Sequence, residues 1–322
     1  MSQLDTLFRH APSPVERLPV PEATDRDISL FVKRDDLLRV GPGLALCGNK
    51  WRKLQYNLQT AKDQGHARLL TFGGAYSNHI AAVAAAGAQF GFEAIGIIRG
   101  ERVAGLNPTL RFAESCGMQL VFVSRSDYRR RHKDGYLHKL QQSYGPAYLL
   151  PEGGTNLLAL RGCMALPQEV KQQLPIPPDY YTLSVGTGGT MAGLIAGLDD
   201  PAQVIGFSAL KGDFLREEVA KWVARTHTAN NRASPWSIQT HYHFGGYAKH
   251  QPALLHFIQN IYQQYGMALD PIYTGKMLYG LLDLIRKDFF PPGSRIVAVH
   301  TGGLQGIAGF NERFGEVLDL GV

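Results

Sequence analysis

A lysine that could act as a reacting amine stands in the stretch LCGNKWRKL, residues 46–54. Lys50 comes directly after Gly48 and Asn49, at the expected start of a helix, with apolar residues on both sides. Most lysines at helix starts are exposed. Burial among apolar side chains would lower the pKa of the amine and prepare it to form a Schiff base with an aldehyde. The stretch alone leaves open whether Lys50 is a surface cation or a nucleophile.

A glycine-rich loop in the stretch SVGTGGTMAGL, residues 184–194, could bind a phosphate. Glycines between a strand and a helix let backbone N–H groups converge on an anion, and the helix N-terminus adds positive potential. The dinucleotide fingerprint is incomplete because Met191 occupies the place of its third glycine, and the Gly-Lys-Ser/Thr of a P-loop is absent. The loop therefore suggests a phosphate without a nucleotide signature, or a turn needed only for packing. Its residues are Gly186, Thr187, Gly188, Gly189 and Thr190.

A second strand end leads into the stretch GGAYSNH, residues 73–79, and then into an alanine-rich helix. Ser77 or Asn78 could cap that helix by accepting its free N–H groups. The same N–H groups could hold a substrate carboxylate, with Ser77 moving a proton and Asn78 donating to a phenolate or carbonyl oxygen. His79 could stack on a ring or pack as an ordinary helix residue. The stretch alone does not decide between these interpretations.

Short apolar runs alternate with helical patterns along the chain, which is typical of a doubly wound α/β architecture with parallel sheets. The runs are nearly continuous, as in strands buried on both faces, and they predict strands at 68–72, 93–99, 119–124, 147–151, 180–185, 203–209 and 295–300. The helical patterns predict helices at 50–64, 78–90, 107–116, 126–144, 190–198, 214–225, 252–265, 275–288 and 305–315. Ligands bind at the carboxyl ends of such strands, and four ends lead into polar or glycine-rich turns, at 73–79, 152–156, 186–190 and 301–306.

The composition is that of a folded globular protein, with 322 residues, 44% apolar and 19% charged. The net charge of +6 is small for this length, and the basic run at 128–134 predicts the exposed start of a helix rather than a nucleic-acid patch. Cys47, Cys116 and Cys163 are far apart and predict neither a disulfide framework nor a zinc site, and no metal is expected. The sequence predicts no signal peptide and no membrane span, so a cytoplasmic protein is expected.

In their order along the chain, these motifs resemble those of the fold-type II pyridoxal-phosphate enzymes, and within them the 1-aminocyclopropane-1-carboxylate deaminase and D-cysteine desulfhydrase family. The resemblance rests on KRDDLL, GNKWRKL, GGAYSNH, EGGTN, SVGTGGTMAGL, DPIYTGK and HTGGLQG, which run from about residue 31 to about residue 309. It implies pyridoxal 5′-phosphate as cofactor, a small amino acid as substrate and a homodimer. It also implies a tryptophan synthase β-like fold of two doubly wound parallel-sheet domains, with the site between them. The small domain would comprise residues 52–150, and the large one residues 1–51 and 151–322.

The resemblance also implies a role for the motif residues already named. Lys50 matches the lysine that forms the Schiff base and later moves the α-proton, which leaves Lys53 as the ordinary cation. Ser77 matches the serine that contacts the substrate carboxylate, and Asn78 matches the residue that bonds the 3′-oxygen of the cofactor. The loop at 186–190 matches the phosphate loop.

Four further positions bear on the choice of substrate. Tyr273, in DPIYTGK, matches a family tyrosine over the cofactor, and Tyr247 lies at the spacing of a second one, although its context FGGYAKH departs from the family pattern. Thr274 stands where the deaminases have an acid that faces the pyridine nitrogen, and Thr301, also a candidate cofactor contact, where they tend to have leucine. A neutral hydroxyl leaves the ring a weaker electron sink, which suits β-elimination of a good leaving group better than cyclopropane opening.

The sequence therefore predicts a lyase that deaminates a small amino acid by β-elimination, like D-cysteine desulfhydrase, giving a keto acid, ammonia and sulfide. A 1-aminocyclopropane-1-carboxylate deaminase is the alternative within the family. The stretch SNHIAAVAA, residues 77–85, lacks the Arg-Gln that follows in typical desulfhydrases, which leaves another small amino acid open as the substrate. Outside the family, the competing hypotheses are a nucleotide-dependent oxidoreductase and a non-catalytic protein that binds pyridoxal phosphate.

Overall fold

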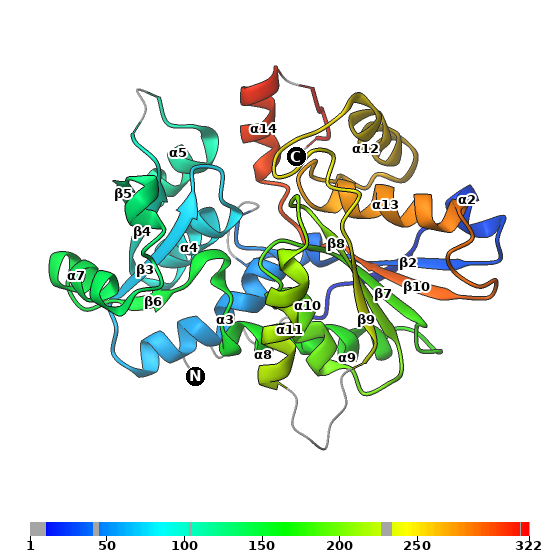
Figure 1. Ribbon diagram of the computed structural model, residues 1–322, viewed down its shortest axis with the longest axis horizontal. Coiled ribbons are helices and arrows are strands. Elements are labelled where there is room, and N and C mark those ends of the chain that lie inside the picture. Colours follow the sequence, from blue (N-terminus) through cyan, green and yellow to red (C-terminus); the bar gives the residue numbers. More distant parts are fainter. Residues whose placement is uncertain (1–10, 41–44, 103–104, 227–233, 316, 322) are drawn as a thin grey trace.

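The computed structural model describes residues 11–40, 45–102, 105–226, 234–315 and 317–321. Its strands form two sheets, one of six strands and one of four. Figure 1 shows the four-stranded sheet on the left and the six-stranded sheet on the right, with helices packed around both. This is the α/β architecture with parallel sheets that the sequence predicts.

The six-stranded sheet has the strand order β1-β2-β10-β7-β8-β9. Its strands are β1 (Val15–Arg17), β2 (Ser29–Lys33), β7 (Tyr180–Val185), β8 (Gln203–Ser208), β9 (Trp236–Gln239) and β10 (Arg295–Val299). All neighbours run parallel except β1, which pairs antiparallel with β2 at one edge. The inner strands β8 and β10 are buried along nearly their whole length, which explains their continuous apolar sequences.

The four-stranded sheet has the strand order β5-β4-β3-β6, and all of its strands run parallel. They are β3 (Arg68–Gly74), β4 (Glu93–Arg99), β5 (Gln119–Val123) and β6 (Tyr148–Leu150). This sheet lies inside residues 52–150, and every strand of the six-stranded sheet lies outside them. The domain boundaries at 52 and 150 stay a prediction.

Helices cover both sheets and place the candidate site residues. Those nearest the site are α3 (Gly48–Asp63), α4 (Asn78–Phe90), α6 (Arg125–Tyr128), α10 (Gly189–Gly197), α13 (Thr274–Arg286) and α14 (Gly306–Phe314). The others are α2 (Pro21–Thr24), α5 (Pro108–Ser115), α7 (Asp134–Tyr144), α8 (Leu157–Cys163), α9 (Ala165–Lys171), α11 (Phe214–Thr226) and α12 (Pro252–Tyr265). In the described part of the chain, no helix combines the length and the apolar character that crossing a bilayer requires.

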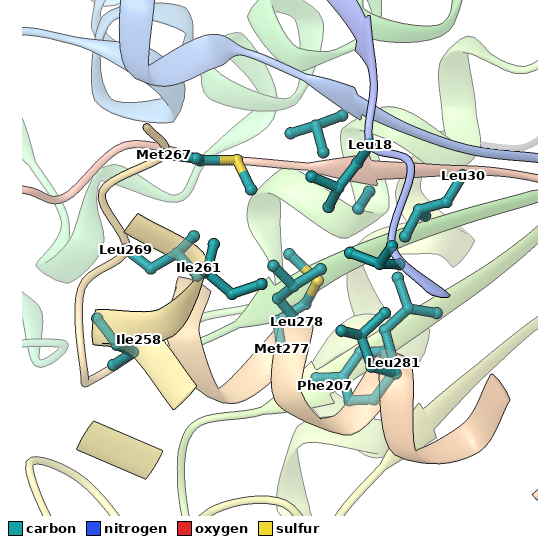
Figure 2. Close-up of a cluster of buried hydrophobic side chains, with 14 of the residues drawn as sticks. Leu18, Leu30, Phe207, Ile258, Ile261, Met267, Leu269, Met277, Leu278 and Leu281 are labelled. Atoms are coloured by element: carbon teal, nitrogen blue, oxygen red, sulfur yellow. The ribbon is translucent and has the colours of Figure 1, made fainter. Parts of the chain in front are cut away.

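The largest apolar cluster packs α12 and α13 against the six-stranded sheet. Figure 2 shows part of it, with Leu278 and Leu281 of α13, Phe207 of β8 and Leu30 of β2 among its members. Each of these side chains is at most 1% exposed. Burying one such side chain stabilises the fold by about 1.5–3 kcal/mol. The cluster therefore fixes α13, and with it the DPIYTGK motif at its N-terminus.

Helix α3 connects the parts of the molecule that form the site. Trp51 and Leu54 are fully buried and belong to the same apolar cluster as Ile80 of α4. On another side, α3 packs directly on α8, since a Cβ atom on Gly162 would lie 1.7 Å from the Arg52 carbonyl oxygen. Only glycine permits so close an approach of two helices at this point.

The sequence did not predict β1, β2, β9, α2, α8 and α9. The most consequential of these is β2, which lies inside the six-stranded sheet although its sequence SLFVK ends in a lysine. Lys33 is fully buried, and its amine pairs with Glu169 at 2.6 Å. A charge that is neutralised by a residue far along the chain cannot be recognised from the strand itself.

The prediction of a single helix at 126–144 is wrong for the middle of that range. The structure has α6 and α7, and most of the basic run at 128–134 lies between them. Lys133 has an extended backbone, with φ −95° and ψ 126°. Arg131 pairs with Glu152 at 2.8 Å, so a tertiary contact competes with continuation of the helix.

Candidate active site

A cavity of about 600 Å³ opens where the carboxyl ends of strands from the two sheets approach one another. Its volume suits a cofactor with a small substrate. With the exception of Thr274, the residues that the sequence proposed for the site line this cavity: Lys50, Ser77, Asn78, Gly186, Thr187, Gly188, Gly189, Thr190, Tyr247, Tyr273 and Thr301. The fold thus brings the motifs together, and the role of each residue follows from its surroundings.

Lys50 lies in the first turn of α3, which passes close to the end of β10. A Cβ atom on Gly48, whose φ is +54°, would lie 2.4 Å from the Thr301 carbonyl oxygen, so only glycine fits there. The Asn49 amide donates to that same oxygen at 3.2 Å. The Lys50 amine donates to Asn49 Oδ1 at 3.1 Å and forms no salt bridge with the described residues. Burial lowers the pKa of Lys50, which favours the uncharged and nucleophilic amine.

The glycine-rich loop joins β7 to α10 and lines one end of the cavity. Gly188 has a φ of +78°, and a Cβ atom there would lie 2.9 Å from Val219 Cγ2. The loop is tied to α3, because Asn49 Nδ2 donates to Thr190 Oγ1 at 3.1 Å. Free N–H groups and the dipole at the start of α10 favour an anion at this end.

Lys53 is not the ordinary cation that the sequence predicts. Its side chain is only 2% exposed, and its amine donates to Gly153 O and Thr155 Oγ1 at 3.0 Å each and to Thr187 Oγ1 at 3.3 Å. Burial, followed by the charge of Lys50, lowers the pKa of Lys53 to about 7. Because residues three apart share one helix face, both amines reach the same cavity. This spacing was the available signal in the sequence.

Ser77 caps α4, with its Oγ accepting from the amides of His79 and Ile80 at 3.2 and 3.3 Å. The predicted cap is therefore confirmed, and Ser77 also lines the cavity. Asn78 Oδ1 accepts a hydrogen bond from Gln305 Nε2, which joins α4 to the turn before α14. Gln305 was not among the residues proposed from the sequence, although it belongs to the HTGGLQG motif.

His79 is packed into the wall of the cavity. Its Nε2 lies 2.8 Å from Thr71 Oγ1, which itself donates to the Leu150 carbonyl at 3.0 Å. Nε2 therefore carries the proton, and the buried Nδ1 has no hydrogen-bond partner. Burial lowers the pKa of His79 well below its ordinary value, so the ring is neutral. These contacts favour the packed helix residue over the stacking partner.

Tyr273 and Tyr247 lie edge to face, with ring centroids 6.2 Å apart, and both line the cavity. Tyr273 also packs against the glycine-rich loop, since a Cβ atom on Gly186 would lie 3.2 Å from its Cε1. Desolvation by the surrounding protein raises the pKa of both phenols, although Tyr247 is still 40% exposed. Both therefore keep their protons at neutral pH and can donate a hydrogen bond or a proton.

Two further side chains, Asp270 and Lys276, hold these tyrosines in place. Asp270 Oδ2 accepts from the Tyr273 amide at 2.8 Å and so fixes the start of α13. Lys276 is buried, and its amine donates to the Gly246 carbonyl at 2.8 Å, directly before Tyr247 in the chain. Both belong to the DPIYTGK motif, whose spacing therefore has a structural reason.

Thr274 does not line the cavity, in contrast to the expected place beside the cofactor. It is fully buried, and its Oγ1 donates to Asp270 Oδ1 at 2.7 Å and accepts from the Asp270 amide at 2.9 Å. Thr301 does line the cavity, and its Oγ1 lies 3.4 Å from Ser184 Oγ. Ser184 and Thr301 therefore each contribute a neutral hydroxyl to the cavity.

The residues around the cavity fit pyridoxal phosphate. Lys50 offers an amine for the aldehyde, and Lys53 together with the loop at 186–190 offers donors for the phosphate. His79 Nδ1 adds a buried polar atom that still lacks a partner. In the described part of the chain, no group of three or more His, Cys, Asp or Glu side chains could hold a metal ion.

Comparison with known proteins decides the family. A model of the family described as pyridoxal-phosphate dependent enzyme matches residues 7–302. The chain belongs to this family. It is 30% identical to a 1-aminocyclopropane-1-carboxylate deaminase of Rhizobium leguminosarum bv. viciae, over 97% of this chain and 98% of the relative. It is also 30% identical to the mitochondrial bifunctional D-cysteine desulfhydrase/1-aminocyclopropane-1-carboxylate deaminase of Arabidopsis thaliana, over 92% and 78% of the two chains.

A solved structure supports the same assignment. The crystal structure of an ACC deaminase homologue matches 99% of this chain and 100% of its own with a TM-score of 0.80, at 26% identity. This pyridoxal-phosphate enzyme therefore has the tryptophan synthase β-like fold, and its cofactor is pyridoxal 5′-phosphate. The hypothesis of a nucleotide-dependent oxidoreductase is wrong.

Replacing Lys53 by glutamine should weaken pyridoxal phosphate binding about 10- to 100-fold, the usual effect of losing a charge-assisted hydrogen bond. The pKa of Lys53 is about 7 in the free protein, and a bound phosphate would raise it. The affinity of the wild type should therefore fall as the pH rises above 7, and this slope should flatten in the variant. Absorbance titration of the apo-protein measures both effects.

Pyridoxal, which lacks the phosphate, serves as the control ligand for Lys53. It should bind the wild type and the glutamine variant equally well at each pH. If the variant loses pyridoxal binding as well, Lys53 supports the shape of the cavity instead of the phosphate.

Proposed function

We propose that this protein is a pyridoxal-phosphate lyase that deaminates a small amino acid by β-elimination, as a D-cysteine desulfhydrase does. The supporting observation is a base and two acids in one cavity. Burial lowers the pKa of Lys50 and raises the pKa of Tyr273 and Tyr247. β-Elimination requires both kinds of group, since a base removes the α-proton and an acid assists the leaving group.

Lys50 and Ser77 act on the amino-acid part of the substrate. The Ser77 hydroxyl and the positive end of the α4 helix dipole bind the carboxylate. The Lys50 amine, once the substrate amine takes its place, removes the proton from the α-carbon. Bound pyridoxal phosphate supplies the aldehyde that captures the amine and a ring that delocalises the electron pair left at that carbon.

Tyr273, with Tyr247 beside it, assists the departure of the β substituent. With a thiol substrate the Cβ–S bond breaks, sulfur takes the electron pair and a phenol proton, and a Cα–Cβ double bond forms. Water hydrolyses the released enamine to a keto acid and ammonia. The neutral hydroxyls of Ser184 and Thr301 leave the ring a weaker electron sink than an acid would, which suits a substituent that leaves easily.

Deamination of 1-aminocyclopropane-1-carboxylate is the second candidate. Its support is the names of the Rhizobium and Arabidopsis relatives. Opening the cyclopropane ring requires a strong electron sink. Asp270, the acid beside Tyr273, does not line the cavity, and its oxygens accept hydrogen bonds from the first turn of α13. This arrangement favours elimination of a β substituent.

The proposed setting is a cytoplasmic homodimer with the site between a small domain, 52–150, and a large domain, 1–51 and 151–322. Cys47, Cys116 and Cys163 form no disulfide within the described residues, which suits a reducing compartment. The strands of the two sheets fall on either side of the proposed boundaries. The homodimer rests on the family resemblance, and light scattering of the purified holoenzyme tests it; a monomeric mass would contradict it.

A screen of D- and L-amino acids with β leaving groups, together with the cyclopropane amino acid, tests the proposed activity. Keto acid, ammonia and sulfide should be measured in the same reactions with purified holoenzyme. Release of all three from cysteine of one configuration supports β-elimination. Keto acid and ammonia from the cyclopropane amino acid alone would establish the second candidate. Bound cofactor without keto acid from any substrate would contradict both and indicate a non-catalytic protein.

A further inference from the structure

Three arginines surround the mouth of the same cavity, and the proposed function uses none of them. Arg99 ends β4, Arg125 begins α6 and Arg313 lies near the end of α14. All three residues are exposed, and all three line the cavity. The fold, rather than any sequence motif, brings these charges to one place.

None of the three forms a salt bridge within the described part of the chain. Arg99 lies 5.6 Å from the ring centroid of Tyr128, and Arg313 lies 5.9 Å from that of Tyr76. Stacking on a ring orients a guanidinium group and leaves its N–H edge free for an anion. Two of the three arginines are thus positioned without being neutralised.

The wall of the cavity offers no free carboxylate to these arginines. Glu152 is the one acidic side chain among the described lining residues, and it already pairs with Arg131 at 2.8 Å. Arg111, which is also exposed but does not line the cavity, has its own partner in Glu312 at 2.6 Å. Unpaired guanidinium groups that line a cavity attract anionic ligands and bind their oxyanions.

The two anions of the proposed reaction have donors elsewhere in the cavity. The loop at 186–190 serves the cofactor phosphate, and Ser77 with the start of α4 serves the substrate carboxylate. Arg99 nevertheless lies close to the substrate end. A Cβ atom on Gly74, shortly before Ser77, would lie 3.4 Å from Arg99 Nη2. A substrate side chain that points toward the mouth would therefore meet them.

We propose that the preferred substrate is an amino acid whose β substituent carries a second anionic group, such as a phosphate or sulfonate, bound by Arg99, Arg125 and Arg313. This inference rests on the proposed function and names its substrate class. With a phosphate ester, Lys50 takes the α-proton, the Cβ–O bond breaks and phosphate leaves with the electron pair. The Cα–Cβ double bond forms, and water converts the enamine to a keto acid and ammonia without any oxidant or reductant.

O-phosphoserine and O-acetylserine, in both configurations, compare an anionic with a neutral leaving group on the holoenzyme. Keto acid release should give a kcat/KM for O-phosphoserine about tenfold above that for O-acetylserine, and added salt should reduce this advantage. Aspartate and asparagine differ by one charge and have no comparable leaving group. Calorimetry should show tighter binding of aspartate to the holoenzyme.

Variants of the arginines test the assignment of residues. Each single replacement of an arginine by glutamine should lower kcat/KM for O-phosphoserine about two- to fivefold more than for O-acetylserine, since single exposed charges contribute modestly. The variants are Arg99→Gln, Arg125→Gln and Arg313→Gln. Arg129→Gln is the matched control. Arg129 is exposed and lies one helical turn after Arg125, but it does not line the cavity, so both values should stay unchanged.

The outcomes separate this inference from the proposed function. Turnover of O-acetylserine without any preference for O-phosphoserine would overturn the anionic substrate and leave β-elimination standing. An equal loss on both substrates in the arginine variants would overturn it too, because the arginines would then bind the α-carboxylate. If neither serine ester releases keto acid, the screen that includes cysteine decides whether the protein catalyses elimination, and tighter binding of aspartate than of asparagine decides whether the arginines select an anion.

Discussion

Replacing Lys50 by alanine should lower kcat for elimination by about 10³-fold or more, because one amine both holds the cofactor and moves the α-proton. In the wild type, borohydride should reduce the cofactor onto the peptide that contains Lys50. In the variant, no reduced cofactor should remain on the chain. Keto acid release and mass spectrometry of the reduced protein measure the two effects.

The same substitution should leave the fold of the apo-protein intact. Among the described residues, the Lys50 amine has one hydrogen bond, to Asn49 Oδ1, and burial lowers its pKa. A lysine whose pKa is lower in the folded state opposes folding at every pH below its unfolded pKa of about 10.4. The unfolding midpoint of the variant at pH 7 should therefore equal or exceed that of the wild type.

Lys62 provides the matched control, since it is an exposed lysine in the last turn of α3. Lys62→Ala should keep full turnover and the same labelled peptide. Reduction of the cofactor onto another lysine, such as Lys53, in the Lys50→Ala protein would contradict the assignment. Unchanged turnover without Lys50 would contradict it as well.

Much of the fold could be predicted because buried parallel strands have a distinctive sequence. The strands at 93–99 and 180–185 and the helices at 78–90 and 252–265 match the predicted bounds, since their apolar patterns are uninterrupted. β2 was missed because its short apolar run ends in a charged residue, Lys33. The burial of that lysine depends on Glu169, which lies 136 residues away in the chain, so no local rule could reveal it.

The motifs predicted which residues gather at the cavity, but not all of their surroundings. Lys53 was misjudged because its partners Thr155 and Thr187 lie 102 and 134 residues away. Thr274 was misplaced because its hydroxyl bonds Asp270, one helical turn earlier, instead of facing the cavity. The arginines at the mouth belong to no motif, and only the folded chain shows that three segments bring them together.

Helix α3 is held in place by a buried group of two cations and two carboxylates. Arg52 is 1% exposed and donates to Asp35 at 2.6 and 2.8 Å and to Glu169 at 2.7 and 2.8 Å. Lys33 completes the group with its bond to Glu169 at 2.6 Å. The group ties α3 to β2, to the turn after it and to α9, and so positions the helix that carries both amines of the site.

Replacing Arg52 by alanine should lower the free energy of unfolding by about 3–5 kcal/mol, because Asp35 and Glu169 would stay buried without their main cation. Urea denaturation of the apo-protein at pH 7 measures this change. The control is Arg26→Ala, which removes an exposed pair with Asp288 at 2.8 Å and should cost at most about 1 kcal/mol. If Arg52→Ala also lowered the free energy of unfolding by at most about 1 kcal/mol, the role of the buried group would be contradicted.

The difference in stability between the two proteins should also depend on pH. Burial alone would raise the pKa of Asp35 and Glu169, but Arg52 holds the pKa of both carboxyls below its ordinary value. Their charges therefore stabilise the wild type above the unfolded pKa of about 4, and this contribution is lost as the pH falls through the folded pKa. Without Arg52, burial raises the pKa of both carboxyls in the folded variant. As the pH falls, these carboxyls bind protons at a higher pH than in the wild type, and their protonation stabilises the variant. The difference should narrow from pH 7 toward pH 4, and a constant difference would mean that Arg52 acts through the packing of its alkyl chain.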